Sequence, residues 1–221
     1  MRGIVLLLAA GEGTRLGSAG PKAFVDIAGV PMLRRSADAA CRAELVDGLV
    51  VAVPDGSEGR ARSLLADCGR EVKVVAGGET RQESAWRALS AAPDRDAVLV
   101  HDAARALCPA RLFDECLGLL DEHEAVCTMI PVWDTLKELS EGVIVRTVDR
   151  SQLGAAQTPQ AFRTALYRRA HEESRRDGVA ATDDAALIER MGVKVWTTLG
   201  HPHNIKITSK LDLELAEALL R

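Results

Sequence analysis

In Leu6-Leu-Leu-Ala-Ala-Gly-Glu-Gly-Thr-Arg-Leu-Gly17, an apolar strand runs into a glycine-rich loop, and Gly20-Pro21-Lys22 follows. Glycines at positions 11 and 13 allow a tight turn and bring backbone N–H groups close to anionic oxygens. Arg15 and Lys22 add two full positive charges. The stretch predicts a loop that holds a polyphosphate, although glycine spacing alone also fits an ordinary surface turn.

Two better-known glycine-rich loops do not match this stretch. Leu16 stands where the third glycine of the dinucleotide-binding pattern belongs, and Pro21 disrupts the helix that would follow. No Gly-Lys-Ser/Thr follows either, which excludes a Walker loop. The sequence therefore disfavours an NAD-linked dehydrogenase.

The composition indicates one compact domain covering residues 1–221. Apolar residues make up 47% and charged residues 27% of the chain, which is ordinary globular usage, and with only 3% aromatic residues the core must be aliphatic. The formal charge of -4 argues against nucleic-acid binding through bulk charge. Any cation in a binding site must therefore act locally.

The cysteines and the N-terminal residues bear on the compartment. Five cysteines without a C-x-x-C pattern fit a reduced cytosol, and we assign none of them to a metal or to catalysis. The apolar run Ile4–Leu8 is too short for a secretory segment or a membrane span. We expect a cytoplasmic protein without a membrane partner.

Apolar runs alternate with segments of helical period as far as residue 131, which predicts an α/β fold with a mostly parallel sheet. The expected strands are Ile4–Ala9, Leu49–Val53, Val72–Val75, Ala97–Val100 and Ala125–Ile130. The expected helices between them are Met32–Ala43, Gly59–Leu65, Arg81–Ser90 and Pro109–Glu122.

The alternation breaks after Pro131. Residues 134–139 and 143–148, joined by a turn at Gly142, read as an inserted hairpin arm at about 132–152. A two-stranded ribbon is marginal in water, so it should pack on something, such as another subunit. Beyond the arm we expect helices at Arg163–Arg175, Thr182–Met191 and Ser209–Leu220, and a strand at Val193–Thr198.

Polar residues follow several expected strands, at the edge where open α/β sheets bind ligands. Gly77-Gly-Glu-Thr-Arg81 precedes a capped helix whose N-terminal amides can accept an anion or a polar ring. Asp102 ends another strand beside the glycine-rich loop. A carboxylate there would repel a triphosphate unless Mg²⁺ lay between them. The alternative is a turn residue before Arg105.

Later residues also have two interpretations. Alternation aims Lys206 away from Ile205 and Ile207, either into a cleft or out to solvent at an exposed edge. Thr182-Asp-Asp184 reads as a helix cap with acidic residues in the first turn. The histidines show no zinc-ligand pattern.

Taken together, these pieces resemble the 2-C-methyl-D-erythritol 4-phosphate cytidylyltransferase family nearly end to end. The matching motifs are Ala9–Arg15, Pro21-Lys22, Gly77–Ser84, Val100–Arg105, Asp134-Thr135, Thr147–Arg150, Thr158–Phe162, Thr182–Asp184 and Asn204–Thr208. Ala106 and His203 depart from the family pattern, and the loss of proline at 106 leaves the loop carrying Arg105 less constrained.

The resemblance implies a nucleotidyltransferase (GT-A-like) fold. It also implies attack by a sugar-alcohol phosphate on the α-phosphorus of CTP, with loss of pyrophosphate. In it, Arg15, Lys22 and Lys206 are catalytic cations and Asp102 holds Mg²⁺. The nucleotide-binding residues would be Ala9, Ala10, Gly11, Gly13, Lys22, Gly78, Glu79, Arg81, Ser84, Asp102, Ala103 and Lys206.

The same resemblance implies a homodimer in which the arm reaches across to the neighbouring subunit. Thr135 and Arg150 would then complete the second substrate's site there, with Arg105 close by. Thr158 and Thr182 complete the set of expected substrate-binding residues.

Other functions remain open at the level of the sequence. A ribitol 5-phosphate cytidylyltransferase would have a similar nucleotide site, and a sugar-phosphate nucleotidyltransferase could use another NTP. A non-catalytic nucleotide-binding regulator is disfavoured, because binding alone does not need Arg15, Lys22, Asp102 and Lys206 together.

Overall fold

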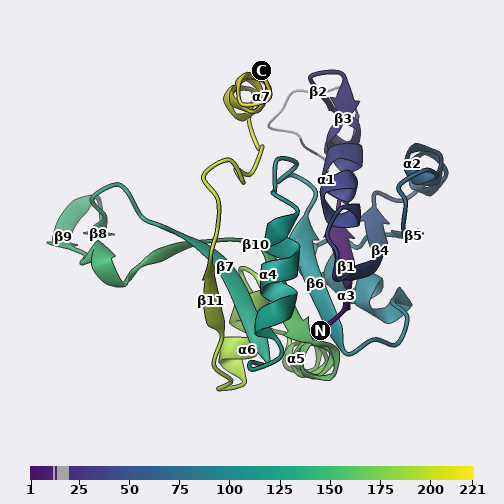
Figure 1. Cartoon of the computed structure of the whole chain (residues 1–221). Helices are drawn as coiled ribbons and strands as arrows, with labels where there is room; N and C mark the ends of the chain where they lie inside the picture. Colours follow the sequence, from purple (N-terminus) through teal and green to yellow (C-terminus); the bar gives the residue numbers. More distant parts are fainter. Residues whose placement is uncertain (12, 14–19) are drawn as a thin grey trace.

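A seven-stranded sheet forms the centre of the computed structural model, which describes residues 1–11, 13 and 20–221 (Figure 1). The strand order is β11-β7-β10-β6-β1-β4-β5. The bounds are β1 Gly3–Leu8, β4 Val46–Val53, β5 Glu71–Ala76, β6 Ala97–Asp102, β7 Ala125–Pro131, β10 Gly154–Arg163 and β11 Trp196–Leu199. All strands run parallel except β10, which pairs antiparallel with both β6 and β7. The expected α/β fold with a mostly parallel, mixed sheet is confirmed.

Helices cover both faces of this sheet. They are α1 Met32–Cys41, α2 Glu58–Leu65, α3 Arg81–Ala91, α4 Arg111–Leu119, α5 Thr164–Asp177, α6 Asp184–Arg190 and α7 Lys210–Ala218, with 3-10 turns η2 Lys22–Phe24 and η3 Arg150–Gln152. Val5 and Leu7 of β1 pack with α1, α2 and α4, while Leu6 and Leu8 pack with α3, α5 and α6. Because successive strand residues point to opposite faces, a strand buried on both sides is apolar at every position, as β1 is.

A smaller apolar cluster attaches α7 to the main body near the carboxyl ends of the strands. It contains Ile27, Met32, Ala106, Ile207 and Ala216. Ile27 belongs to a short ribbon of β2 Asp26–Ile27 and β3 Val30–Pro31. Ser209 begins α7 with a capping box, in which its hydroxyl accepts from the Asp212 N–H. This cluster fixes the segment that carries Lys206.

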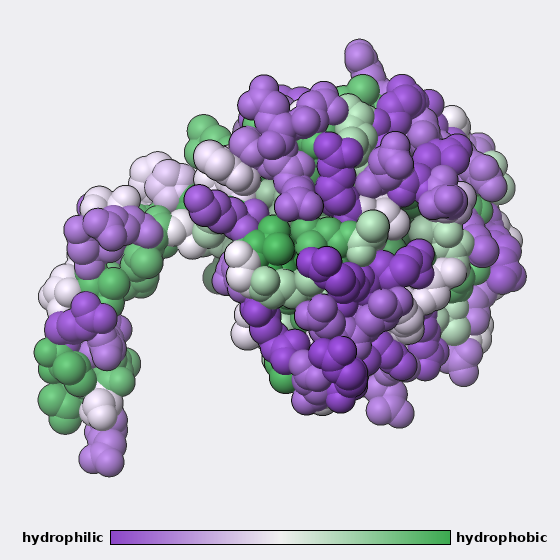
Figure 2. Space-filling view, turned by 90° about the horizontal axis from the view of Figure 1, so that it is seen from below, coloured by the Kyte–Doolittle hydropathy of each residue, from purple (hydrophilic) through white to green (hydrophobic). Residues whose placement is uncertain are grey.

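The hairpin arm forms as expected, from β8 Lys137–Ser140 and β9 Val143–Thr147. Glu141 and Gly142 both have positive φ, of 49° and 82°, which is the conformation of a tight two-residue hairpin turn. The arm projects away from the sheet and its helices, and apolar residues are visible along it (Figure 2). Trp133, Leu139, Val143 and Ile144 are all more than half exposed there.

Strand β10 was not predicted from the sequence. Pro159 interrupts its pattern, and proline is normally excluded from the interior of a sheet because it has no backbone N–H to donate. The pairing between β10 and β7 shifts register between Ala156 and Gln160, so Pro159 lies within an irregularity of the ladder. The extended run expected around Lys206 is not a strand either, because residues 200–208 form turns and irregular backbone.

Several other bounds differ from the expected ones by a few residues. Helix α4 begins at Arg111 rather than at Pro109, and α6 begins at Asp184 because Asp183, not Thr182, is its N-cap.

No helix among residues 1–11, 13 and 20–221 is long and apolar enough to cross a membrane.

Candidate active site

The glycine-rich loop leaves β1 where the sheet's carboxyl edge opens. The Ala9 N–H still donates to the Ala52 carbonyl of the neighbouring strand at 2.8 Å, so the loop departs from a fixed point. Gly13 has a φ of +72°, and a Cβ there would come within 2.5 Å of the Lys22 Cβ. Only glycine allows this close approach, which holds Lys22 against the loop. Arg15, the other expected cation, lies outside the described residues.

A second glycine turn, between β5 and α3, packs against the first. A Cβ on Gly77 would come within 2.3 Å of the Ala10 Cβ, so glycine lets the two loops touch. The Thr80 hydroxyl accepts from the Glu83 N–H at 3.0 Å and begins α3. The buried Ser84 hydroxyl accepts from the Gly78 N–H at 3.0 Å and so fixes the turn against the start of α3. Ala10, Gly77 and Gly78 therefore form one wall of the site.

Asp102 lies at the carboxyl end of β6, next to this wall. Its Oδ1 is 2.9 Å from Arg81 Nε, and its Oδ2 is 2.7 Å from Lys206 Nζ. Burial alone would raise the pKa of Asp102, but the charges of Arg81 and Lys206 outweigh burial and hold it well below its usual range. Its two cationic partners therefore favour the charged carboxylate form of Asp102.

Arg81 continues the charge network into the interior. Its Nη1 is 2.6 Å from the Asp184 carboxylate, whose side chain is 1% exposed, and the Tyr167 hydroxyl donates to that carboxylate at 2.5 Å. Burial opposes the charge on Arg81, but Asp184 and Asp102 outweigh it and raise the pKa of the guanidinium. The guanidinium is thereby held between two carboxylates, with one face toward the cleft.

Sequence reasoning gave Asp184 and Tyr167 no role in this site. Asp184 fits a simple acidic first turn of a helix, which hid its ion pair with Arg81. Tyr167 is the chain's single tyrosine and lies in a segment of helical period, the pattern of an ordinary core residue. One signal was available: Tyr167 carries a hydroxyl that needs a partner when it is buried, and it is fully buried.

A cleft of about 220 Å³ opens over these groups. Its lining includes the expected nucleotide-binding residues Ala9, Ala10, Gly11, Lys22, Gly78, Glu79, Arg81, Ser84, Asp102, Ala103 and Lys206. Leu8, Ala23, Met32, Thr80 and Ala104 also line it, and were not among the expected residues. Lys22 and Lys206 come from segments far apart in the chain, so the fold brings two cations and the loop backbone to one cleft.

The expected substrate residues Thr158 and Arg105 lie beside the cleft and support it. The buried Thr158 hydroxyl accepts from the Asp102 N–H at 3.1 Å and is 2.8 Å from His101 Nδ1. Arg105 donates to the carbonyls of Asn204 and Ala156, at 2.7 and 3.2 Å. Both side chains hold the cleft's backbone in this conformation, and their contact with a substrate stays a prediction.

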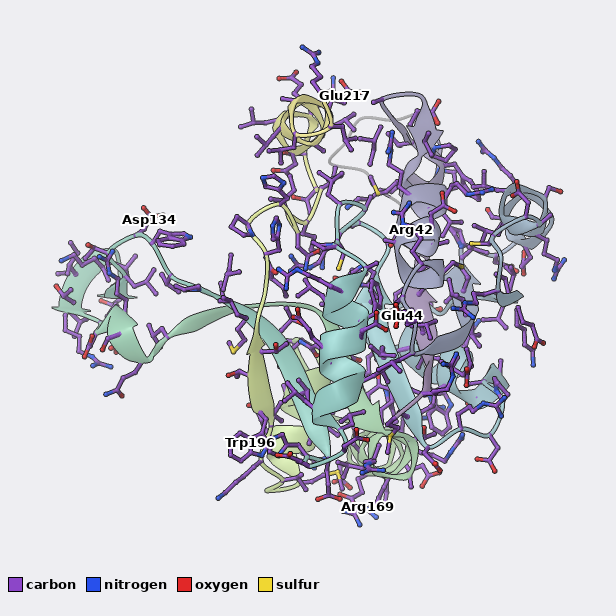
Figure 3. The ribbon with its side chains drawn as sticks, viewed as in Figure 1. Arg42, Glu44, Asp134, Arg169, Trp196 and Glu217 are labelled. Carbon is purple, nitrogen blue, oxygen red and sulfur yellow. The ribbon has the colours of Figure 1, made fainter. Side chains whose placement is uncertain are left out.

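Three further expected substrate residues lie elsewhere. Thr182 is exposed, and Asp183 beside it caps α6 by accepting from the Ala186 N–H at 3.0 Å. Thr135 and Arg150 are exposed on the arm, where Arg150 donates to the Trp133 carbonyl. Figure 3 labels Asp134, the neighbour of Thr135, on the arm and well away from the sheet. The fold does not bring Thr135 and Arg150 to their own chain's cleft.

The metal expected at Asp102 would have few protein ligands. Among the residues that the structure describes, no group of three or more histidine, cysteine or acidic side chains is arranged to hold a metal ion. A single carboxylate does suit Mg²⁺, which commonly combines one or two carboxylates with substrate phosphates. Because the Lys206 side chain is 44% exposed, it can leave Oδ2 of Asp102 without disturbing the core. The donor set therefore fits Mg²⁺ bound together with a polyphosphate.

Comparisons with known proteins agree with one another. The family model for 2-C-methyl-D-erythritol 4-phosphate cytidylyltransferase (IspD) matches residues 4–221. The protein of that name from Rhodococcus jostii is 46% identical over 98% of this chain and 94% of its own length. The crystal structure of the Thermus thermophilus protein of that name superimposes with a TM-score of 0.83 at 37% identity, covering 99% of this chain and 98% of that one. The structure of 4-diphosphocytidyl-2C-methyl-D-erythritol synthase from Anaerococcus prevotii gives a TM-score of 0.89 at 27% identity, over 99% of this chain and 98% of that one.

Proposed function

Because the chain belongs to the 2-C-methyl-D-erythritol 4-phosphate cytidylyltransferase family, we propose that it transfers the cytidylyl group of CTP to 2-C-methyl-D-erythritol 4-phosphate. A phosphate oxygen of the acceptor attacks the α-phosphorus, and pyrophosphate leaves. The products are 4-diphosphocytidyl-2-C-methyl-D-erythritol and pyrophosphate, in the non-mevalonate route to isoprenoid precursors. Family membership over residues 4–221 is the observation that carries this proposal.

The nucleotide half of the site is the cleft at the carboxyl edge. The backbone from Ala9 to Gly13 receives the phosphates, and the turn at Gly78 and Glu79, with Arg81, Ser84 and Ala103, frames the base and ribose. The contact between the two glycine turns supports this assignment, because it fixes the backbone donors before the nucleotide binds. Preorganised donors lose little entropy when CTP binds.

Charge stabilisation is the main catalytic task in this proposal. Lys22 and Lys206 face the cleft from two sides, and we assign both to the charge that develops around the α-phosphorus, together with Arg15. Lys206 begins paired with Asp102 at 2.7 Å and, being 44% exposed, can move to a phosphate when CTP arrives. This contact raises kcat to the extent that it strengthens as charge develops in the transition state.

Asp102 is the residue we assign to Mg²⁺. When bound there with CTP, the ion would neutralise part of the triphosphate charge and so favour attack by an anionic acceptor. Asp102 would hold the ion, while Arg81 keeps Oδ1 of the carboxylate in place. We expect Asp102→Ala to weaken Mg²⁺-dependent turnover much more than folding, in Mg²⁺ titrations run beside thermal melts. Normal turnover by the variant would return Asp102 to a structural role.

The acceptor half of the site requires a second copy of the chain. We propose a single catalytic domain whose arm reaches into a partner, so that Thr135 and Arg150 complete the partner's acceptor site beside Arg105, Thr158 and Thr182. Trp133, Leu139 and Val143 are 71%, 63% and 67% exposed on the arm, which supports burial against another subunit. The five free cysteines suit a cytoplasmic location.

Mixed dimers test the shared site. Lys206→Ala and Arg150→Ala each inactivate the homodimer in this proposal, but a mixed dimer contains one site with neither substitution. We expect activity to return when the two inactive proteins exchange subunits. If exchange is demonstrated by native mass spectrometry and no activity returns, the arm does not complete the partner's site.

Direct identification of the product tests the reaction. Incubation with CTP, Mg²⁺ and 2-C-methyl-D-erythritol 4-phosphate should yield the cytidine diphosphate-linked polyol by mass spectrometry, with one pyrophosphate per product. Lys210→Ala serves as the matched control for Lys206→Ala, since Lys210 is an exposed lysine four residues later. Absence of this product from correctly folded wild-type protein would refute the proposed function.

A further inference from the structure

Two cysteines outside the cleft lie in direct contact. Cys41 is the last residue of α1, and Cys68 follows α2 in the turn that leads to β5. Their sulfurs are 2.9 Å apart although 27 positions separate them in the sequence. An approach of about 1 Å would bring them to the disulfide bond length of about 2.05 Å. The fold therefore presents the two thiols to each other.

Arginines hold the backbone on both sides of this pair. Arg70, just before β5, donates to the Cys41 carbonyl at 3.3 Å and to the Ala43 carbonyl at 3.2 Å. Arg34 of α1 donates to the Leu64 carbonyl of α2 at 3.1 Å. These contacts join the three segments whether or not the sulfurs are bonded. The close approach of the two sulfurs is thus a result of how these segments pack.

The surroundings also separate the two thiols chemically. The two thiols share a hydrogen bond in which either sulfur can be the donor, and this contact lowers the pKa of the Cys68 thiol. Cys68 is buried, with 7% of its surface exposed, whereas Cys41 is half-buried, so the pair is open to solvent on the side of Cys41. Since the thiolate is the reactive form, Cys68 is the expected nucleophile and Cys41 its neighbouring thiol.

The other three cysteines lack this arrangement. Cys108, Cys116 and Cys127 are buried, and burial raises the pKa of both Cys116 and Cys127 to about 12. Among the residues that the structure describes, their hydrogen-bond partners are oxygens, with the Gln160 amide as a further partner of Cys127, rather than another sulfur. Oxidation should therefore select Cys41 and Cys68.

We propose that Cys41 and Cys68 are a modification site that forms a reversible intramolecular disulfide when the protein meets a peroxide. The Cys68 thiolate attacks one peroxide oxygen, the O–O bond breaks, and the released hydroxide takes a proton to become water. The Cys41 sulfur then attacks the resulting sulfenic acid, and its proton leaves with the expelled hydroxide as a second water. The two thiols are oxidised by two electrons in total, and the peroxide is reduced.

The bond would fasten α1 to the turn between α2 and β5 without reaching the cleft. Met32, which lines the cleft, begins α1 nine residues before Cys41, a distance of about 14 Å along the helix axis. Closing a loop between positions 27 apart restricts the unfolded chain. Oxidation should therefore raise Tm by roughly 5–10 °C and leave the catalytic activity unchanged.

Peptide mapping of the full-length protein tests the proposal. After treatment with hydrogen peroxide and blocking of free thiols, non-reducing digestion should yield the Cys41 and Cys68 peptides joined, lighter by two hydrogens than their sum. A thiol reductant should separate them and reverse the rise in Tm. Joined peptides that contain other cysteines, links between two chains, or Cys68 oxidised to sulfinic acid while Cys41 stays free would each overturn the proposal.

Variants separate this bond from other effects of oxidation. Cys41→Ser and Cys68→Ser should lose both the joined peptide and the rise in Tm, whereas Cys108→Ala, which changes a cysteine outside the pair, should keep both. The same rise in Tm in Cys41→Ser would refute the role of the pair. If a serine variant folds poorly, the peptide map of the oxidised wild-type protein still tests the proposal.

Discussion

Replacing Asp184 by asparagine tests the buried charge network behind the cleft. The Asp184 side chain is 1% exposed, lies 2.6 Å from Arg81 Nη1 and accepts from the Tyr167 hydroxyl at 2.5 Å. Asparagine keeps the shape and an acceptor for Tyr167, but removes the charge. Arg81 would then face Asp102 alone, with its guanidinium still inside the protein.

The expected cost follows from this geometry. Removing one partner of a buried ion pair commonly destabilises a protein by about 3–5 kcal/mol, because an uncompensated charge remains. Arg81 keeps its contact with Asp102 at 2.9 Å, so the loss should fall at the lower end, about 3 kcal/mol. For a chain of this size that corresponds to a fall in Tm of roughly 6–12 °C.

Asp183→Asn provides a matched control one residue away. Asp183 caps α6 through the Ala186 N–H and accepts from Gln160 Nε2 at 2.8 Å, and asparagine caps helices about as well as aspartate. Its cost should therefore stay near 1 kcal/mol. Urea unfolding of both variants, read by circular dichroism, measures the difference. Equal stability of Asp184→Asn and the wild type, or equal losses in the two variants, would refute the reasoning.

Three further predictions concern the cleft and the effect of pH. Lys206→Ala should lower kcat about 10²- to 10³-fold in a pyrophosphate-release assay, while Lys210→Ala leaves it unchanged; equal rates would remove Lys206 from catalysis. Burial lowers the pKa of His171 from 6.5 to about 4, so the histidine of the unfolded chain takes up its proton at a higher pH than that of the folded protein. The free energy of unfolding should therefore fall by roughly 3 kcal/mol as the pH drops from 6.5 to 4. His171→Leu should lose this part of the pH dependence in urea melts, and an unchanged slope would contradict it. Hydrogen bonds from the Thr208 N–H and other groups lower the pKa of Asp212 from 3.8 to about 2, so the cap of α7 is fully formed above pH 3.8 and is lost as the pH falls through 2. Hydrogen exchange should show α7 opening in that pH range, and continued protection of its amides would count against the cap.

The sequence carried enough information for most of the fold. β1, β4 and β6 are apolar at nearly every position, and such continuous runs separated by helical segments are typical of strands buried on both faces. β10 escaped prediction because Pro159 breaks its pattern and because its pairing with β6 and β7 joins distant segments. Local pattern cannot report a partner that lies about 60 residues away.

The candidate site, like the fold, was predictable from the sequence only where it depends on local features. Glycine turns and strand ends are local features, so the cleft around Asp102 and Gly78 could be anticipated from the order of the motifs. The ion pair between Arg81 and Asp184 joins two elements, α3 and α6, and depends on how α6 packs, which no local pattern records. Lys206 was expected to point into a cleft from a strand, yet turns and the apolar cluster with Ile207 hold it there instead.

The choice of acceptor and nucleotide decides whether the protein is a 2-C-methyl-D-erythritol 4-phosphate cytidylyltransferase. Initial rates of pyrophosphate release should be measured for CTP, ATP, GTP and UTP, each with 2-C-methyl-D-erythritol 4-phosphate, ribitol 5-phosphate or a hexose phosphate, in the presence of Mg²⁺. We expect efficient release with CTP and 2-C-methyl-D-erythritol 4-phosphate, and little with the other pairs. Release only with a hexose phosphate, or a higher kcat/KM for ribitol 5-phosphate, would contradict this expectation.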